Sequence, residues 1–192
     1  MSNIYLGLVH YPINNKNNEV VTTSVTNLDI HDISRSCRTF GIKNYFLITP
    51  LEAQHELVQR ILGHWEEDSS SVYNPDRKDA LSIARLSKSV DNAINKISEL
   101  ESVRPLVVVT GANFKHDTGS VSDLLEKMKI DKRPCFLLFG TGWGLHADLV
   151  EQADFSLDPI EGKSEDGYNH LAVRSAVAIY LDRLATASVP LK

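Results

Sequence analysis

The chain has 192 residues, of which 42% are hydrophobic and 23% charged, and it contains two cysteines. This composition is typical of a globular protein with one sizeable core, and it excludes a disordered, a collagen-like or a disulfide-stapled chain. The formal net charge of −5 argues against a protein that binds nucleic acid by bulk electrostatic attraction, but it leaves room for a local basic face.

The N-terminal residues and the cysteine usage predict a soluble, cytoplasmic protein. The apolar run at residues 4–9 is too short for a signal-peptide core or a membrane span, and no basic cluster precedes it. Cys37 and Cys135 stand far apart without a cysteine or histidine at metal-ligand spacing. The sequence therefore offers no cysteine-based metal site and no disulfide framework, and a reducing compartment fits it best.

Short apolar runs alternate with longer amphipathic stretches, a pattern typical of βαβ units that build a parallel sheet. Strands are predicted at residues 4–9, 45–49, 106–110 and 136–139, with weaker candidates at 81–86 and 155–157. Helices are predicted at residues 27–40, 52–65, 90–101, 121–128, 147–153 and 170–184. We expect one α/β domain over residues 1–192, with mobile surface segments at 68–78 and 161–167 and a frayed tail at 185–192.

The first predicted helix carries apolar and charged residues on separate faces. Ile33 and Cys37 recur at helical spacing and predict an inward face. Asp32, Arg35 and Arg38 line up on another face. By itself, such a row of charges is typical of solvated ion pairs, each of which stabilises a helix by about 0.2–0.5 kcal/mol.

A glycine-rich loop follows the strand predicted at residues 136–139. Gly140, Gly142 and Gly144 stand at alternate positions, and because glycine lacks a Cβ, backbone N–H groups in such a loop can approach a ligand closely. From the motif alone, a packing turn explains these glycines equally well. The loop comes too late in the chain for a Rossmann dinucleotide site, which disfavours a nicotinamide-dependent oxidoreductase, and it lacks the Lys-Ser/Thr of a Walker loop.

The last predicted helix is apolar around most of its circumference. Such helices are usually covered on two sides, by the sheet and often by a second subunit. Asn169 is a candidate N-cap of this helix, and His170 follows in the first turn. Arg174, one turn further on, requires an acidic partner.

Together and in this order, these stretches resemble the α/β-knot methyltransferases, the SPOUT superfamily. They resemble in particular its small stand-alone bacterial RNA methyltransferases that depend on S-adenosylmethionine (SAM), over nearly the whole chain. The resemblance is carried by the runs His10-Tyr11-Pro12, Thr26-Asn27-Leu28-Asp29-Ile30-His31-Asp32, Phe139-Gly140-Thr141-Gly142-Trp143-Gly144-Leu145 and Tyr168-Asn169-His170-Leu171.

The resemblance implies a C-terminal trefoil knot, a homodimer, SAM bound in the knot, and a structured RNA, either tRNA or rRNA, as substrate. No metal is implied. The implied SAM pocket consists of three loops. Its residues are Thr110, Gly111 and Ala112 in the first, Phe139, Gly140, Thr141, Gly142, Gly144 and Leu145 in the second, and Leu157, Pro159, Ile160, Asn169, His170 and Leu171 in the third.

The resemblance also implies a substrate side. Asn27, Asp29, Arg35 and Arg38 are its candidate catalytic residues, and the two arginines are suited to phosphate contacts. Further cations suited to RNA docking are Arg60, Arg77, Lys78, Arg85 and Lys88.

The acceptor atom stays open. Ribose methyltransferases of the superfamily carry a Glu in the glycine motif and a Ser-Leu-Asn in the last motif, whereas this chain has glycines and His170-Leu171-Ala172 at those places. Methylation of a base and of a ribose are therefore both compatible with the sequence. The alternative function is a catalytically inactive SAM-binding dimer that acts as a sensor or an assembly factor.

Overall fold

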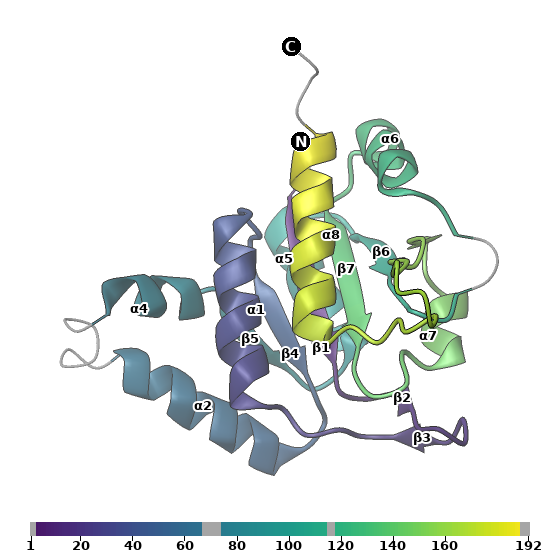
Figure 1. The fold of residues 1–192 in the computed structure, drawn as a ribbon. Coiled ribbons are helices and arrows are strands. Elements are labelled where there is room, and N and C mark those ends of the chain that lie inside the picture. Colours follow the sequence, from purple (N-terminus) through teal and green to yellow (C-terminus); the bar gives the residue numbers. More distant parts are fainter. Residues whose placement is uncertain (1–2, 67–73, 115–117, 189–192) are drawn as a thin grey trace.

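The computed structural model describes residues 3–66, 74–114 and 118–188 (Figure 1). Its centre is a six-stranded parallel sheet with the order β5-β4-β1-β7-β6-β8, which confirms the expected α/β class. The strands are β1 (Ile4–Val9), β4 (Tyr45–Ile48), β5 (Ala84–Ser87), β6 (Leu106–Val109), β7 (Cys135–Gly140) and β8 (Phe155–Ser156). A separate antiparallel pair, not predicted, joins β2 (Ile13–Asn14) to β3 (Val20–Val21).

Helices cover both faces of the sheet. One face packs against α1 (Asn27–Thr39), α2 (Glu52–Glu66), α4 (Pro75–Leu81), α6 (Val121–Asp131) and α8 (Val173–Ala187). The other packs against α5 (Val90–Glu101) and α7 (Ala147–Glu151). No helix in the described part of the chain is long and apolar enough to cross a membrane.

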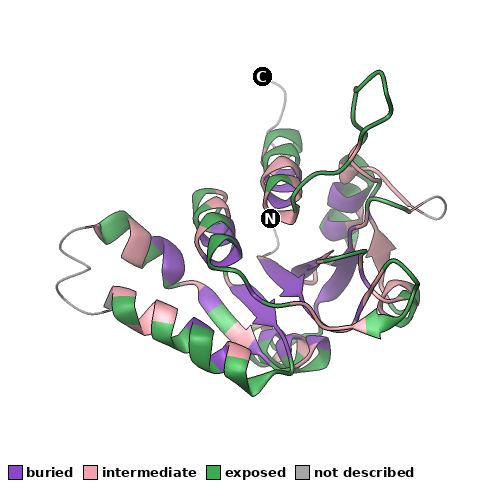
Figure 2. Cartoon of the chain, turned by 60° about the horizontal axis from the view of Figure 1, so that its bottom comes forward, coloured by how far each residue is buried: buried purple, intermediate pink, exposed green. Residues whose placement is uncertain are grey.

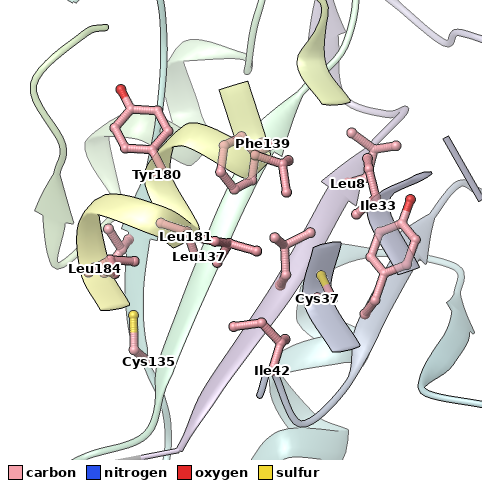
Figure 3. Close-up of a cluster of buried hydrophobic side chains, with 14 of the residues drawn as sticks. Leu8, Ile33, Cys37, Ile42, Cys135, Leu137, Phe139, Tyr180, Leu181 and Leu184 are labelled. Carbon is pink, nitrogen blue, oxygen red and sulfur yellow. The ribbon is translucent and has the colours of Figure 1, made fainter. Parts of the chain in front are cut away.

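The central strands are buried on both sides, as Figure 2 shows by their colour. In β1, Leu8 points toward the core under α1 and α8, whereas Val9 belongs to the core under α5, because successive strand residues face opposite sides. Figure 3 shows Cys37 of α1 and Leu181 of α8 with Leu8 and other side chains of the first core. Burial of these side chains fixes α1 and α8 beside each other over β1 and β7.

The chain between α2 and β5 differs from the prediction. Residues 81–86 were expected as a strand, but Leu81 ends α4 and the strand begins at Ala84. Part of the expected mobile segment 68–78 is helical: Asn74 accepts a hydrogen bond from the backbone N–H of Arg77, and Pro75 occupies the first helical position. An Asn-Pro pair is a signal for a helix start as well as for a turn. Residues 68–73 of that segment lie outside the described residues.

The last helix begins later and ends later than predicted. It starts at Val173 instead of His170, and its N-cap, Ala172, makes no side-chain hydrogen bond. The expected capping role of Asn169 is therefore wrong: its side-chain amide donates to the Ile160 carbonyl at 2.9 Å. Ala187 ends the helix, so the frayed tail expected from residue 185 is wrong for its first three residues, while 189–192 lie outside the described residues.

Candidate functional site

A cavity of about 360 Å³ opens where β6 and β7 end. Ligands of open parallel sheets bind at the carboxyl ends of the strands, because the loops that follow neighbouring strands converge there. The cavity is bounded by the loops after β6 and β7, by the segment before α8 with the first turns of that helix, and by residues 23–29.

Most of the residues predicted for the SAM pocket line this cavity. They are Thr110, Gly111, Ala112, Phe139, Gly140, Thr141, Gly142, Gly144, Ile160, Asn169 and Leu171. Four others do not line it. Leu145 and Leu157 belong to the two hydrophobic cores, Pro159 is half-buried beside the cavity-lining segment, and the exposed His170 ring lies 5.4 Å from the Tyr168 ring.

The glycine loop after β7 is shaped by its own backbone. A Cβ on Gly140 would lie 2.6 Å from the Leu145 backbone nitrogen and 2.9 Å from the Gly144 carbonyl carbon, so only glycine allows the loop to close. Gly144 has a φ of +103°, which side chains rarely allow. Asn14 of β2 anchors the loop, accepting from the Trp143 N–H at 3.2 Å and donating its own N–H to the Gly144 carbonyl at 3.0 Å.

A chain of hydroxyl groups, not foreseen from the sequence, ties β1 to the cavity wall. The Thr141 hydroxyl donates to the Val9 carbonyl at 3.1 Å, and its oxygen lies 2.5 Å from the Thr23 hydroxyl, which in turn lies 2.9 Å from His10 Nδ1. Since a carbonyl only accepts, Thr23 donates to Thr141 and His10 Nδ1–H donates to Thr23. His10 Nε2 is buried without a hydrogen-bond partner among the described residues.

Burial lowers the pKa of His10 to about 4, against the weaker opposing effect of the Asp29 carboxylate. A folded-state pKa below the unfolded value means that the unfolded chain binds the extra proton, so stability falls as the pH drops below 6.5. We expect His10 to lower the free energy of unfolding by about 1.5 kcal/mol between pH 6.5 and 5. Urea unfolding of the wild type and of His10→Gln at both pH values measures the difference, and an equal pH dependence in the two proteins would contradict it.

An ion-pair cluster joins α1 to α8 next to the cavity. Thr26 caps α1, its hydroxyl donates to the Asp29 carboxylate at 2.5 Å, and Asp29 lines the cavity. Arg174 Nη1 lies 3.4 Å from Asp29, and its Nε lies 3.3 Å from the Asp32 carboxylate. These two carboxylates are the acidic partners that Arg174 was expected to require.

The four predicted catalytic residues are separated by the structure. Asp29 faces the cavity, whereas Asn27 and Arg35 line a second hollow between α1, α2 and α4. Arg38 lines neither hollow: its Nε lies 2.8 Å from the Asp79 carboxylate of α4, and about half of its side chain is exposed. Whether any of the four acts in catalysis stays a prediction.

Several cavity residues were missed by the sequence reasoning. They are Thr23, Ser24, Thr26, Val173, Ala176 and Tyr180. The Tyr180 hydroxyl donates to the Asp158 carbonyl at 2.6 Å, and burial raises its pKa to about 12. The helix-cap signal of Thr26 was readable in the sequence, but no pattern linked residues 23–24 or α8 to the glycine loop.

The cavity fits SAM in its chemistry. Four glycines, Gly111, Gly140, Gly142 and Gly144, leave bare backbone on two of its walls. Apolar side chains, among them Phe139 and Leu171, enclose the rest together with threonine hydroxyls. Mostly apolar walls with a few polar groups, in a volume of about 300 Å³ or more, are typical of small-molecule sites.

Comparison with known proteins shows the family to which the chain is similar. A family described as SAM-dependent RNA methyltransferase matches residues 3–186. The chain is 44% identical, over 95% of its length, to a tRNA (guanine-N(1)-)-methyltransferase of Oleidesulfovibrio alaskensis, but it spans only 42% of that protein. It is 36% identical to an uncharacterized protein of Aquifex aeolicus, covering 95% of this chain and 88% of that one.

Solved structures share the fold at low sequence identity. A probable methyltransferase of Bordetella pertussis matches with a TM-score of 0.64 and 12% identity, over 98% of this chain and 97% of that one. The SpoU methyltransferase AviRb of Streptomyces viridochromogenes, solved with AdoMet, matches with a TM-score of 0.58 and 14% identity, over 100% of this chain and 59% of that one. The chain therefore shares its fold with these solved methyltransferases.

Proposed function

The chain belongs to the family of SAM-dependent RNA methyltransferases, and from this premise we propose that it transfers a methyl group from SAM to a structured RNA. The observation that carries the proposal is the cavity at the carboxyl ends of β6 and β7, with bare glycine backbone on two walls and the start of α1 beside it. We propose tRNA as the RNA class, supported by the name of a relative that is more than twice as long as this chain.

Methyl transfer is an in-line displacement at carbon, so the protein must align the acceptor with the methyl group and take up a proton where the acceptor carries one. SAM supplies the methyl group on a positively charged sulfur. We propose that Gly111, Phe139 and Leu171 hold it in the cavity, while the Asp29 carboxylate, at the cavity wall, faces the acceptor. Asn27 and Arg35, two turns apart on α1, are proposed to hold the RNA on the outer side of that helix.

A homodimer and the trefoil knot are parts of the same proposal. Two large apolar side chains just before α8 are exposed, Tyr168 to 63% and Leu171 to 46%, and Leu171 also lines the cavity. A second subunit that covers them would bury apolar surface and close the cavity on one side. Light scattering of the purified protein measures the expected twofold mass.

The test of the function is methyl transfer from tritiated SAM to bulk bacterial tRNA and, separately, to ribosomal RNA. Label in tRNA supports the proposal, and nucleoside analysis of the product then distinguishes base from ribose methylation. Label in ribosomal RNA alone would overturn the tRNA assignment. SAM binding without transfer to either RNA would favour the inactive SAM-binding dimer, and a folded protein that binds no SAM would overturn the whole proposal.

Substitution of the two arginines of α1 distinguishes a residue that contacts the RNA from one that forms only a structural ion pair. We expect Arg35→Ala to lower the rate of methyl transfer about tenfold, because one charge-assisted phosphate contact contributes about 1.5 kcal/mol. Arg38→Ala should change the rate less than about twofold, since surface ion pairs such as Arg38–Asp79 contribute little. Steady-state rates at saturating SAM measure both variants, and a larger loss in Arg38→Ala would reverse the assignment.

A further inference from the structure

A hollow of about 710 Å³ lies between α1, α2 and α4, on the other side of α1 from the SAM cavity. We call it the basic groove, because its lining includes Arg35 of α1, Arg60 of α2 and Arg77 of α4. Figure 1 shows α2 and α4 on the same side of α1, and all three helices contribute residues to the groove.

The groove is organised around Trp65. The Arg77 guanidinium carbon lies 4.8 Å from the centre of the Trp65 ring, and the His31 ring meets the same indole edge-on at 5.9 Å. An arginine stacked on an aromatic face keeps its N–H groups free at the edge of the guanidinium plane, where they match phosphate oxygens. Trp65 thus holds Arg77 ready for an anion.

The positive groups in the groove lie close enough to act on one another. Burial lowers the pKa of His31, and the nearby Arg77 and Arg35 lower it further, while Asp32 opposes them. His31 Nδ1 is buried without a hydrogen-bond partner among the described residues. A neutral ring beside two guanidinium groups adds a polar surface without adding to their repulsion.

The charge of the groove is not neutralised within the described chain. None of Arg35, Arg60 and Arg77 forms an ion pair with a described residue. The carboxylate that lines the groove, Asp32, is bound to Arg174 at 3.3 Å. Three arginines that lack an ion-pair partner among the described residues, gathered in one hollow, stand out on a chain with a net charge of −5.

Two of the other cations that the sequence suggested for docking, Arg85 and Lys88, are engaged elsewhere. The Arg85 guanidinium donates to the Ser82 and Ala84 carbonyls at 2.7 and 2.8 Å. Lys88 binds the Glu52 carboxylate at 2.6 Å. These contacts leave the groove as the better anion site, and they make Arg85 and Lys88 suitable controls.

We propose that the basic groove binds the phosphate backbone of the substrate RNA beside the nucleotide that enters the active site. The inference rests on the proposed function and adds the path of the RNA. The first turn of α1 contributes Asp29 to the SAM cavity and Asn27 to the groove, so a strand in the groove passes directly by the cavity. Phosphates bound there fix the register of the RNA, while base recognition takes place at the cavity.

A second copy of the chain fits the groove less well. In a two-fold interface centred on the groove, the same patch meets itself, so the arginines of one subunit would face those of the other. Like charges placed together at an interface are unfavourable, whereas phosphates offer opposite charge at a regular spacing. Charge complementarity therefore favours RNA.

The test compares Arg60→Ala/Arg77→Ala with the control Arg85→Ala/Lys88→Ala in fluorescence-anisotropy titrations of labelled bulk tRNA at several salt concentrations. Loss of two phosphate contacts should lower the slope of log K against log salt by about 1.4–1.8 and weaken binding at least about tenfold, equally for different tRNA pools. The control should keep the wild-type slope. The single variant Arg77→Lys keeps the positive charge but loses the planar stacking, so its slope should stay close to that of the wild type.

SAM titration and light scattering on the same samples distinguish the outcomes. Wild-type SAM affinity and mass, with a reduced salt slope in the groove variant alone, support the proposal. If the wild-type protein methylates RNA but the groove variant keeps an unchanged slope, the groove proposal is overturned while the methyltransferase function stands. A change of mass with unchanged RNA binding would show the groove to be a subunit interface and would also overturn the proposal. If the wild-type protein itself binds no SAM, the proposed methyltransferase function is refuted, and not the groove alone.

Discussion

Replacing Gly140 with alanine is expected to weaken SAM binding about 100-fold, or about 3 kcal/mol. The added Cβ would lie 2.6 Å from the Leu145 nitrogen and 2.9 Å from the Gly144 carbonyl carbon, and backbone atoms cannot move aside as a flexible side chain would. The loop must open, and it carries residues 139–144 of the cavity wall with it. Isothermal titration with SAM measures the loss.

The matched control is Gly63→Ala in α2. A Cβ at Gly63 meets nothing within 4 Å, and alanine in a helix is about 0.5–1 kcal/mol more favourable than glycine. This variant should bind SAM as the wild type does and unfold at a slightly higher temperature. A Gly140→Ala protein with a wild-type circular dichroism spectrum and wild-type SAM affinity would show that the glycine loop does not form the SAM site.

Arg174→Ala is expected to lower the free energy of unfolding by about 3 kcal/mol, and Tm by roughly 6–12 °C. Asp29 is 7% exposed at its side chain and Arg174 is 31% exposed, so removing the arginine leaves a buried carboxylate without its counter-charge. The value is taken at the low end of what buried pairs show because the guanidinium is partly in contact with water. Thermal unfolding followed by circular dichroism measures the shift.

A double-mutant cycle isolates the cause. In Asp29→Asn/Arg174→Ala the unpaired charge is gone, while the amide oxygen still accepts from the Thr26 hydroxyl, so the double variant should be more stable than Arg174→Ala alone. Arg183→Ala, on the exposed side of the same helix, should change stability by less than about 0.5 kcal/mol. Additive losses in the cycle would mean that Arg174 acts through packing of its alkyl chain.

Local signals account for the parts of the fold that the sequence predicted. The apolar run at residues 4–9 matches β1 over its full length, because a strand buried on both faces is apolar throughout. The predicted helix at 90–101 matches α5, because its apolar residues recur at helical spacing. The Asn74-Pro75 pair starts α4 although it lies in the segment 68–78 that was predicted as mobile surface, since an Asn-Pro pair occurs in turns as well as at helix starts. The later start of α8 follows from Asn169, which binds the Ile160 carbonyl in preference to a helix N-terminus.

The sequence by itself determined the parallel α/β class and the glycine loop, because apolar runs and glycines at alternate positions are local properties, and its resemblance to SPOUT methyltransferases predicted most of the cavity lining. Only the tertiary structure decided that Thr23 and Tyr180 join that cavity. It also decided that Arg35 lines the basic groove, whereas Arg38 pairs with Asp79. It also placed Trp65 and Arg77 in one groove with Arg35. Such neighbours come from helices far apart in the chain, and packing on the sheet brings them together without leaving a pattern in the sequence.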